Sequence, residues 1–216
     1  MTSNELKILA QSGEGVRTEF KQKANHPDRI VNEIVAFANT KGGTLLIGVH
    51  DNGQVSGVKH PEDDQVFIIQ FLKDHIKPKP ELSYGIIPVG PKKGVIWIKV
   101  TNQSRRLFAS HLSSEPEAGV VYVRIADESV KASAELRRIL RNASTPRGRI
   151  IQFSDIESTI LKALEDQERS TLPDLVQATG IKKKVVSNCL VNLVLAKVLE
   201  IIPHQPNDFF IFKDEP

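Results

Sequence analysis

The chain has 216 residues, of which 40% are hydrophobic and 25% are charged, and its net charge is +3. Such a composition is typical of a soluble globular protein with room for one large domain or two modest ones. No apolar run approaches the ~20 residues that span a bilayer, and the start of the chain lacks the basic and apolar segments of a signal peptide, so we expect a cytoplasmic protein. The single cysteine, Cys189, excludes an internal disulfide and a multi-cysteine zinc site, and its apolar neighbours favour a buried structural thiol.

Lysine and arginine outnumber the acidic residues before residue 149, whereas acidic residues are in excess after it. The basic excess of the first part favours a polyanionic partner there. The sequence contains no G-x-x-x-x-G-K-[ST] segment, which argues against nucleotide hydrolysis on a phosphate-binding loop.

The first acidic segment follows a short amphipathic helix predicted over residues 4–11. A strand is predicted over 16–21, and because Phe20 must face the core, Glu19 and Lys21 are expected to face outward together. Glu14 lies five residues before Glu19, so in one regular strand the two side chains would point to opposite faces. They converge only if the chain bends before the strand, and the glycines that flank Glu14 permit such a bend.

The clearest helix is predicted over 28–40, where apolar residues recur with a period of 3.6 and Gly42-Gly43 ends the pattern. Residues 44–50 are nearly all apolar, which predicts a central strand that is covered on both faces. Asp51 follows this strand at the point where it leaves the core, a common position for functional carboxylates of α/β domains.

The remaining pattern predicts two domains. Further elements of the first are a helix over 63–76, a hairpin of strands 82–89 and 94–100, a strand over 120–125 and a helix over 132–141. A linker rich in Ser, Thr, Pro and Gly follows at 142–149, so we expect domains at 1–145 and 150–216.

The order of the elements predicted in the second domain is that of a winged helix-turn-helix. Helices are predicted over 155–167, 172–179 and 182–199, followed by two short strands over 200–202 and 208–212. The expected fold class is therefore α+β, with a mixed sheet packed against helices and a small winged helix domain at the C-terminal end.

Several segments closely resemble the Schlafen AlbA-like domain over roughly residues 12–140. The resemblance rests on Glu14-x4-Glu19-Phe20-Lys21, Ala36-Phe37-Ala38-Asn39-Thr40-x-Gly42-Gly43, Ile47-Gly48-Val49-x-Asp51-x-Gly53 with Gly57, and Val121-Tyr122-Val123-Arg124 followed by Ser129. Schlafen proteins use three acidic residues of this domain in a metal-dependent endoribonuclease site that acts on structured RNA such as tRNA.

The resemblance implies that Glu14, Glu19 and Asp51 are catalytic residues and metal ligands, with Lys21 as a basic catalytic neighbour. Three carboxylates around one point repel one another, and Mg²⁺ or Mn²⁺ is the natural compensating ion because hard divalent ions prefer oxygen ligands. Such an ion would polarise a phosphate and activate the attacking oxygen, and Lys21 would stabilise the developing charge. The Schlafen core joins two such lobes, so a homodimer is expected of a chain with one.

Two alternatives stay open at this point. The same pattern occurs in relatives regarded as DNA-binding regulators, so a non-catalytic transcriptional regulator that uses both domains is the second hypothesis. Without any metal, Glu19 would pair with Arg17 or Lys21 on a solvated strand face, and Asp51 would only cap a turn.

Basic residues of both domains are expected to contact nucleic acid. Lys182, Lys183 and Lys184 open the expected recognition helix, where cations oppose the helix dipole unless phosphates lie nearby, although the net acidic second domain would also suit dimerisation. The full predicted set is Arg17, Lys41, Arg105, Arg106, Arg124, Arg137, Arg138, Lys182, Lys183 and Lys184.

Overall fold

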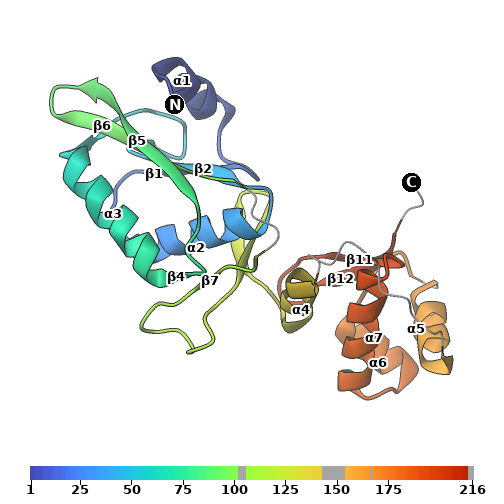
Figure 1. Cartoon of the computed structure of the whole chain (residues 1–216). Coiled ribbons are helices and arrows are strands. Elements are labelled where there is room, and N and C mark those ends of the chain that lie inside the picture. The colour runs from blue at the N-terminus through green and yellow to red at the C-terminus, as the bar shows by residue number, and fades with distance from the viewer. Residues whose placement is uncertain (102–105, 143–153, 166, 214–216) are drawn as a thin grey trace. The chain divides into compact units, whose positions relative to one another are not determined.

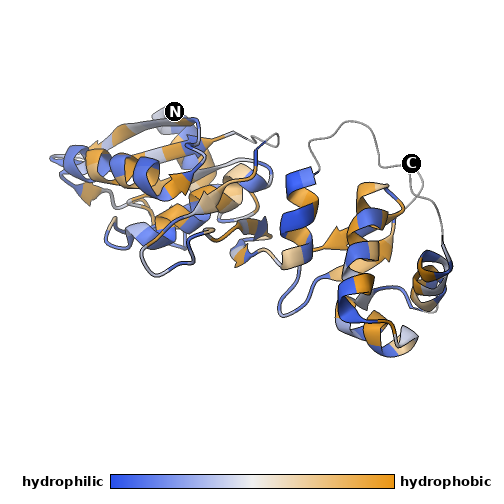
Figure 2. Ribbon diagram, turned by 60° about the horizontal axis from the view of Figure 1, so that its bottom comes forward, coloured by the Kyte–Doolittle hydropathy of each residue, from blue (hydrophilic) through white to orange (hydrophobic). Residues whose placement is uncertain are grey.

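The structure is a computed structural model, and it describes residues 1–101, 106–142, 154–165 and 167–213 (Figure 1). The chain divides into two compact units, Met1–Lys131 and Ala132–Pro216. Hydrophobic residues are frequent in the strands and run along one side of the helices, whereas hydrophilic residues occupy the opposite side of the helices (Figure 2). Each unit has a hydrophobic core of its own.

A five-stranded mixed sheet forms the centre of the first unit. The edge strand β1 pairs in parallel with β2, and all other pairs are antiparallel in the order β1-β2-β6-β3, with β5 also on β6. This arrangement confirms the expected α+β class. The strands are β1 (Thr18–Lys21), β2 (Gly43–Ile47), β3 (Val58–Lys59), β5 (Leu82–Gly90) and β6 (Lys93–Val100).

Helices cover both faces of this sheet. Helices α2 (Pro27–Asn39) and α3 (Pro61–His75) pack on one face, and α1 (Ser3–Ser12) lies on the other (Figure 1). Two small antiparallel pairs complete the unit, β4 (Ile76–Lys77) with β7 (Ala109–Ser110) and β8 (Tyr122–Ile125) with β9 (Glu128–Lys131). Strand β2 is buried on both faces, as its apolar sequence predicts.

The segment that follows α2 explains the Ala-Phe-Ala-Asn-Thr-x-Gly-Gly motif in physical terms. The Asn39 amide accepts from the backbone N–H of Phe108 at 2.8 Å and donates to the carbonyls of Phe108 and Tyr122, so it fastens two distant segments to the helix. Gly42 has a φ of 70° and ends the helix by donating to the Phe37 carbonyl. A Cβ at Gly43 would overlap the Phe37 ring, so only glycine fits there.

The second unit contains four helices and a three-stranded sheet of order β10-β12-β11 among its described residues. Cys189 is buried, as predicted, and burial raises the pKa of its thiol to about 12, with the nearby Glu157 as a further cause. The elements are α4 (Ala134–Asn142), α5 (Asp155–Glu165), β10 (Ser170–Thr171), α6 (Leu172–Thr179), α7 (Lys183–Leu195), β11 (Leu199–Ile202) and β12 (Phe209–Phe212).

The division between the units falls earlier in the chain than the expected domain limits of 1–145 and 150–216. Helix α4 groups with the second unit because its polar side chains bind α7: the Ser187 hydroxyl donates to Glu135 at 2.5 Å, and Arg138 donates to Asn188 at 2.9 Å. The linker expected at 142–149 lies, from residue 143 onward, outside the described residues. Within the described ranges, no helix is both long enough and apolar enough to cross a membrane.

Candidate functional site

Glu19 is buried, although the sequence predicts an outward-facing side chain. Strand β1 pairs with β2 so that Glu19 lies beside Leu45, and that face of the sheet is covered by α2. Phe20 faces the opposite core, as expected, and the exposed fraction of Glu19 is only 5%. The expectation of a solvated strand face was wrong because both faces of the edge strand are covered.

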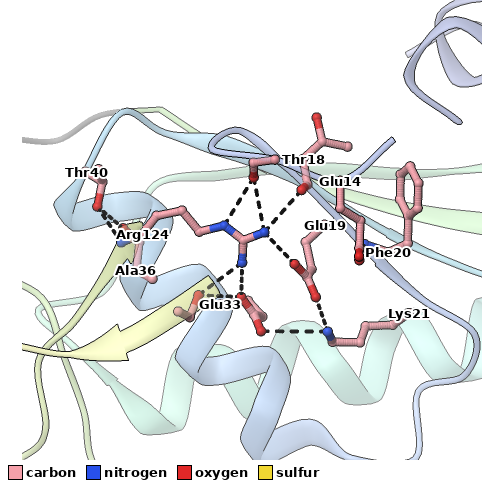
Figure 3. Close-up of polar contacts among 11 residues, drawn as sticks. Glu14, Thr18, Glu19, Phe20, Lys21, Glu33, Ala36, Thr40 and Arg124 are labelled. Carbon is pink, nitrogen blue, oxygen red and sulfur yellow. Dashed lines mark hydrogen bonds and ion pairs between the residues drawn. The ribbon is translucent and has the colours of Figure 1, made fainter. Parts of the chain in front are cut away.

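Arg124 lies at the centre of the site and binds Glu19 (Figure 3). Its side chain has no exposed surface, and its Nη2 is 2.6 Å from the Glu19 Oε2. Arg124 was predicted to contact nucleic acid, and this prediction was wrong because strand β8 places the guanidinium inside the unit. The same guanidinium lies over the Phe37 ring, with its Cζ 5.1 Å from the ring centroid.

Glu33, on α2, is the second carboxylate of the cluster, and the sequence analysis missed it. Its Oε2 accepts from the Arg124 Nη1 at 2.7 Å and from the Ser129 hydroxyl at 2.5 Å. Burial raises the pKa of Glu33, and the nearby Glu19 charge raises it further. A signal was present, since Glu33 lies between the buried Ile30 and Phe37 on the apolar stripe of the helix.

Lys21 completes the cluster as its second cation. Its ammonium group forms an ion pair with the Glu19 Oε1 and lies 3.7 Å from the Glu33 Oε1. Both oxygens of Glu19 therefore bind cations, Oε1 to Lys21 and Oε2 to Arg124. Two positive and two negative side chains balance one another in a region with little access to water.

The bend required for Glu14 is present. The backbone of Gly15 exchanges hydrogen bonds with Thr18 at 3.0 and 3.3 Å, which reverses the chain just before β1. Arg124 holds this turn by donating to the carbonyls of Gly15 and Thr18. The Glu14 carboxylate returns along the strand and accepts from the Phe20 backbone N–H at 2.9 Å.

Glu14 lies close enough to Glu19 and Asp51 for their charges to act on its carboxylate. Burial raises the pKa of Glu14, and the charges of Glu19 and Asp51 raise it further, whereas the Phe20 N–H and Lys21 lower it. Asp51 is exposed in the turn that follows β2. Glu14, Glu19 and Lys21 therefore lie together, and Asp51 is near enough for its charge to act on Glu14.

The carboxylates do not fit a metal ion as they lie. Among the residues that the structure describes, no group of three or more His, Cys, Asp or Glu side chains is arranged to hold one. The reason is visible in Glu19, whose two oxygens bind Lys21 and Arg124 in place of an external cation. Glu14 and Asp51 would remain as two carboxylates, and an ion bound by them would complete its coordination with several waters.

The other predicted nucleic-acid contacts differ in accessibility. Arg138 is engaged with α7, and Arg137 is partly buried. Arg105 lies outside the described residues. The exposed members of the predicted set are Arg17, Lys41, Arg106, Lys182, Lys183 and Lys184.

The fold and these motif residues define an AlbA-like domain, in which a mixed sheet packed between helices carries an acidic motif on its edge strand. The sequence profile of the family described as Schlafen, AlbA_2 matches residues 14–133, which is more than half of the chain. The chain therefore belongs to the Schlafen AlbA_2 family.

Three solved structures are similar to parts of the chain. The N-terminal domain of a putative ATP-dependent DNA helicase RecG-related protein from Nitrosomonas europaea is 20% identical, with a TM-score of 0.43, over 62% of this chain and 94% of that one. The DIP2311 protein from Corynebacterium diphtheriae is 16% identical, with a TM-score of 0.46, over 74% of this chain and 32% of that one.

The third structure is of BpsR from Bordetella bronchiseptica, described in connection with regulation of its DNA binding by 6-hydroxynicotinic acid. It is 26% identical, with a TM-score of 0.27, over 29% of this chain and 45% of that one. The chain thus spans less than half the length of BpsR and of DIP2311. No curated protein sequence matches the chain.

Proposed function

We propose that this protein binds nucleic acid through both of its units and acts as a regulator that does not cleave its ligand. The observation that carries the proposal is the pairing of Glu19 with Lys21 and Arg124, which occupies both carboxylate oxygens. A carboxylate that is held in this way stabilises the fold and is not available as a metal ligand. Exposed basic residues in both units remain free to contact phosphates.

The second unit supports this proposal as a winged helix-turn-helix. Its order of helices α5, α6 and α7 followed by the β11–β12 hairpin is the order of that motif, and α7 would be the recognition helix. Lys182, Lys183 and Lys184 are exposed at the start of α7, where phosphates would offset the unfavourable position of cations at a helix N-terminus.

Helix α4 restricts how α7 would read DNA. Ser187 and Val191 lie on the side of α7 away from the core residues Val186 and Leu190, yet both are buried, and Ser187 binds α4. The face that a recognition helix turns toward base edges is therefore partly covered within the unit. Binding in this arrangement depends on the exposed lysines at the N-terminal end of α7, which contact the backbone and not the base edges.

Two measurements separate the candidate functions: binding of duplex DNA supports the regulator, and cleavage of RNA supports the endoribonuclease. We expect duplex DNA to bind with an affinity that falls steeply with salt, and the triple variant Lys182→Ala/Lys183→Ala/Lys184→Ala to lower both the affinity and the salt dependence. The matched control is Lys7→Ala/Lys73→Ala/Lys79→Ala, which removes the same charge from exposed positions of the other unit that are outside the predicted contact set. Unchanged affinity of the triple variant would contradict the role of α7.

A metal-dependent endoribonuclease of Schlafen type is the second candidate. It is favoured by the convergence of Glu14, Glu19 and Asp51, which contributes to the raised pKa of Glu14. This function requires that Glu19 leave Arg124 when RNA and Mg²⁺ or Mn²⁺ bind. Cleavage of a structured RNA such as tRNA by the wild type, and its loss in Glu19→Gln, would establish this candidate in place of the first.

A homodimer remains part of the proposal, since Schlafen cores contain two AlbA-like lobes and this chain contains one. Light scattering at the concentrations used for binding is the direct test. A mass equal to that of one chain, free and with bound nucleic acid, would rule the dimer out.

A further inference from the structure

A cleft of about 700 Å³ opens in the first unit next to the carboxylate cluster. Two of its walls come from the segments that follow the parallel strands β1 and β2, represented by Gln22 and His50, whose side chains are hydrogen-bonded to each other. The carboxyl ends of parallel strands are the usual place for ligand sites in sheets covered by helices. The volume lies within the range of small-molecule sites, about 300–1,000 Å³.

Three lysines give the cleft a positive charge. Lys59 on β3 and Lys93 on β6 are direct partners in the antiparallel register, and Lys23 follows β1. Like charges directly opposite each other destabilise a strand pair. None of the three forms an ion pair with any residue that the structure describes, and Asp64 is the one carboxylate among the residues that line the cleft. A bound polyanion would relieve this repulsion.

An exposed aromatic ring forms another part of the cleft. Phe67 on α3 lines it with 53% of its surface exposed, and its ring centroid lies 5.8 Å from that of Phe71. An apolar ring that is half open to water beside unpaired lysines matches the way in which proteins bind unpaired bases, with stacking on the ring and phosphates on nearby cations. The amides of Gln22 and Asn25 add hydrogen-bonding groups for a base edge.

We propose that this cleft binds an unpaired nucleotide of a single-stranded nucleic acid, with the base stacked on Phe67 and the adjoining phosphates bound by Lys23, Lys59 and Lys93. This inference rests on the proposed nucleic-acid binding and specifies its site and ligand class. A base inside a duplex is stacked between its neighbours, so its face is not available to Phe67. The cleft therefore selects single strands or unpaired loops over uniform duplex.

Fluorescence anisotropy with labelled single strands of about twelve nucleotides, oligo(dT) and oligo(U), and with a duplex of the same length tests this inference on the full chain. Phe67→Ala is expected to weaken single-strand binding about tenfold, since stacking of one base contributes about 1–3 kcal/mol, and to change duplex binding less than about twofold. The matched control is Val66→Ala, a neighbour on the same helix that is 71% exposed and does not line the cleft.

The lysines are tested through the salt dependence. Lys59→Ala/Lys93→Ala is expected to reduce the slope of log affinity against log salt by about 1.4 for single strands, because each phosphate contact contributes about 0.7. The control, Lys7→Ala/Lys73→Ala, removes the same charge from exposed positions outside the cleft. Equal thermal melting of all variants excludes unfolding as the cause.

The outcomes are distinct. If the wild type binds neither single strands nor duplex, the proposed function itself fails. If the wild type binds but Phe67→Ala and the lysine pair bind single strands as well as it does, the cleft is not the site. If a free mononucleotide binds as tightly as the oligonucleotide, the cleft is a nucleotide site and not a strand site.

Discussion

At the scale of single residues, Arg124 determines which groups the acidic residues of the family motif bind in the folded protein. Its guanidinium binds Glu19 and Glu33 and also the carbonyls of the turn before β1, so one side chain holds the acidic strand, α2 and the turn together. A planar guanidinium forms such divergent contacts, whereas an ammonium group does not. With Lys21, it neutralises two carboxylates that would otherwise be costly to bury.

Replacing Arg124 by Met is expected to lower the free energy of unfolding by about 3–5 kcal/mol, because Glu19 and Glu33 would then share one cation in a buried region. Urea denaturation followed by circular dichroism measures the change. The control Arg106→Ala removes an exposed arginine and should change the value by less than about 0.5 kcal/mol. A loss below about 1 kcal/mol in Arg124→Met would show that the cluster does not stabilise the fold.

Glu14→Gln tests whether the pKa of Glu14 is raised in the folded protein. Because the pKa of Glu14 is raised in the folded protein by burial and then by Glu19 and Asp51, folding favours the protonated form, and the wild type loses stability as pH rises through the raised pKa. The glutamine retains an oxygen that accepts from the Phe20 N–H and carries no charge.

The variant should therefore gain stability relative to the wild type as the pH rises from about 4 to 7, because the ordinary pKa of a glutamate lies near the lower end of this range. The measurement is the difference in unfolding free energy between the two proteins at both pH values. A difference that is constant, or that falls toward pH 7, would show that the pKa of Glu14 is not raised in the folded protein.

At the scale of elements, two adjacent glycines set the position of β2 relative to α2: the first ends the helix, and the second allows the strand to pack closely against it. The helix ends where Gly42 adopts a positive φ, and the next residue passes so close to the Phe37 ring that no side chain fits. This close approach brings β2 directly under the helix and aligns β1 beside it. The position of Glu19 beneath α2 depends on that approach.

Gly43→Ala is expected to destabilise the protein by about 1–3 kcal/mol, because its Cβ would overlap the Phe37 ring and force the helix or the strand to move. The midpoint of thermal unfolding gives the measurement. Gly90→Ala is the matched control, since an added Cβ there meets no atom within 4 Å. Equal midpoints for the two variants would contradict the tight packing.

The contact of α4 with α7 covers part of the α7 surface and so limits the access of DNA to that helix. Glu135→Ala/Arg138→Ala removes the hydrogen bonds from α4 to Ser187 and Asn188 and should expose the covered face of α7. We expect tighter binding of duplex DNA, measured by anisotropy, if that face reads DNA. Arg141→Ala, an exposed change on the same helix, is the control. Weaker or unchanged binding would show that α4 does not shield a reading surface.

At the scale of the whole molecule, the chain consists of two units with separate hydrophobic cores. The core of the first unit is divided between the two faces of its sheet, and the second core is formed by α5, α6, α7 and the β11–β12 pair. Two binding units in one chain raise the affinity for a long nucleic acid because the second contact is intramolecular. The proposed regulator therefore depends on both units being present.

Residues 1–131 and 132–216 are expected to fold as separate fragments, because each contains a complete core and the ion-pair cluster lies wholly in the first. Each fragment should show a cooperative thermal transition by circular dichroism and dispersed amide signals by NMR. A first fragment that is unfolded on its own would mean that its stability requires the second unit.

The family resemblance implied that Glu14, Glu19 and Asp51 converge near Lys21. Periodicity in the sequence predicted nearly all of the major helices and strands and the mixed sheet. It missed the short strands β4, β7, β9 and β10, which have two to four residues and carry no periodic signal. It also missed Glu33 and misassigned Arg124. Both errors concern side chains whose surroundings are set by segments far away in the chain.

The sequence by itself determined most of the elements, the family and the residues of the acidic motif, because helical and strand periods, turn glycines and motif spacings are local properties of the chain. The tertiary structure alone decided what those acids do in the folded protein. Arg124 meets Glu19 across 105 positions of sequence, and only the packing of α2 and β8 against the edge strand makes that pair possible. Burial then favours an internal cation over an external one, since an unpaired carboxylate in that place would be far more costly.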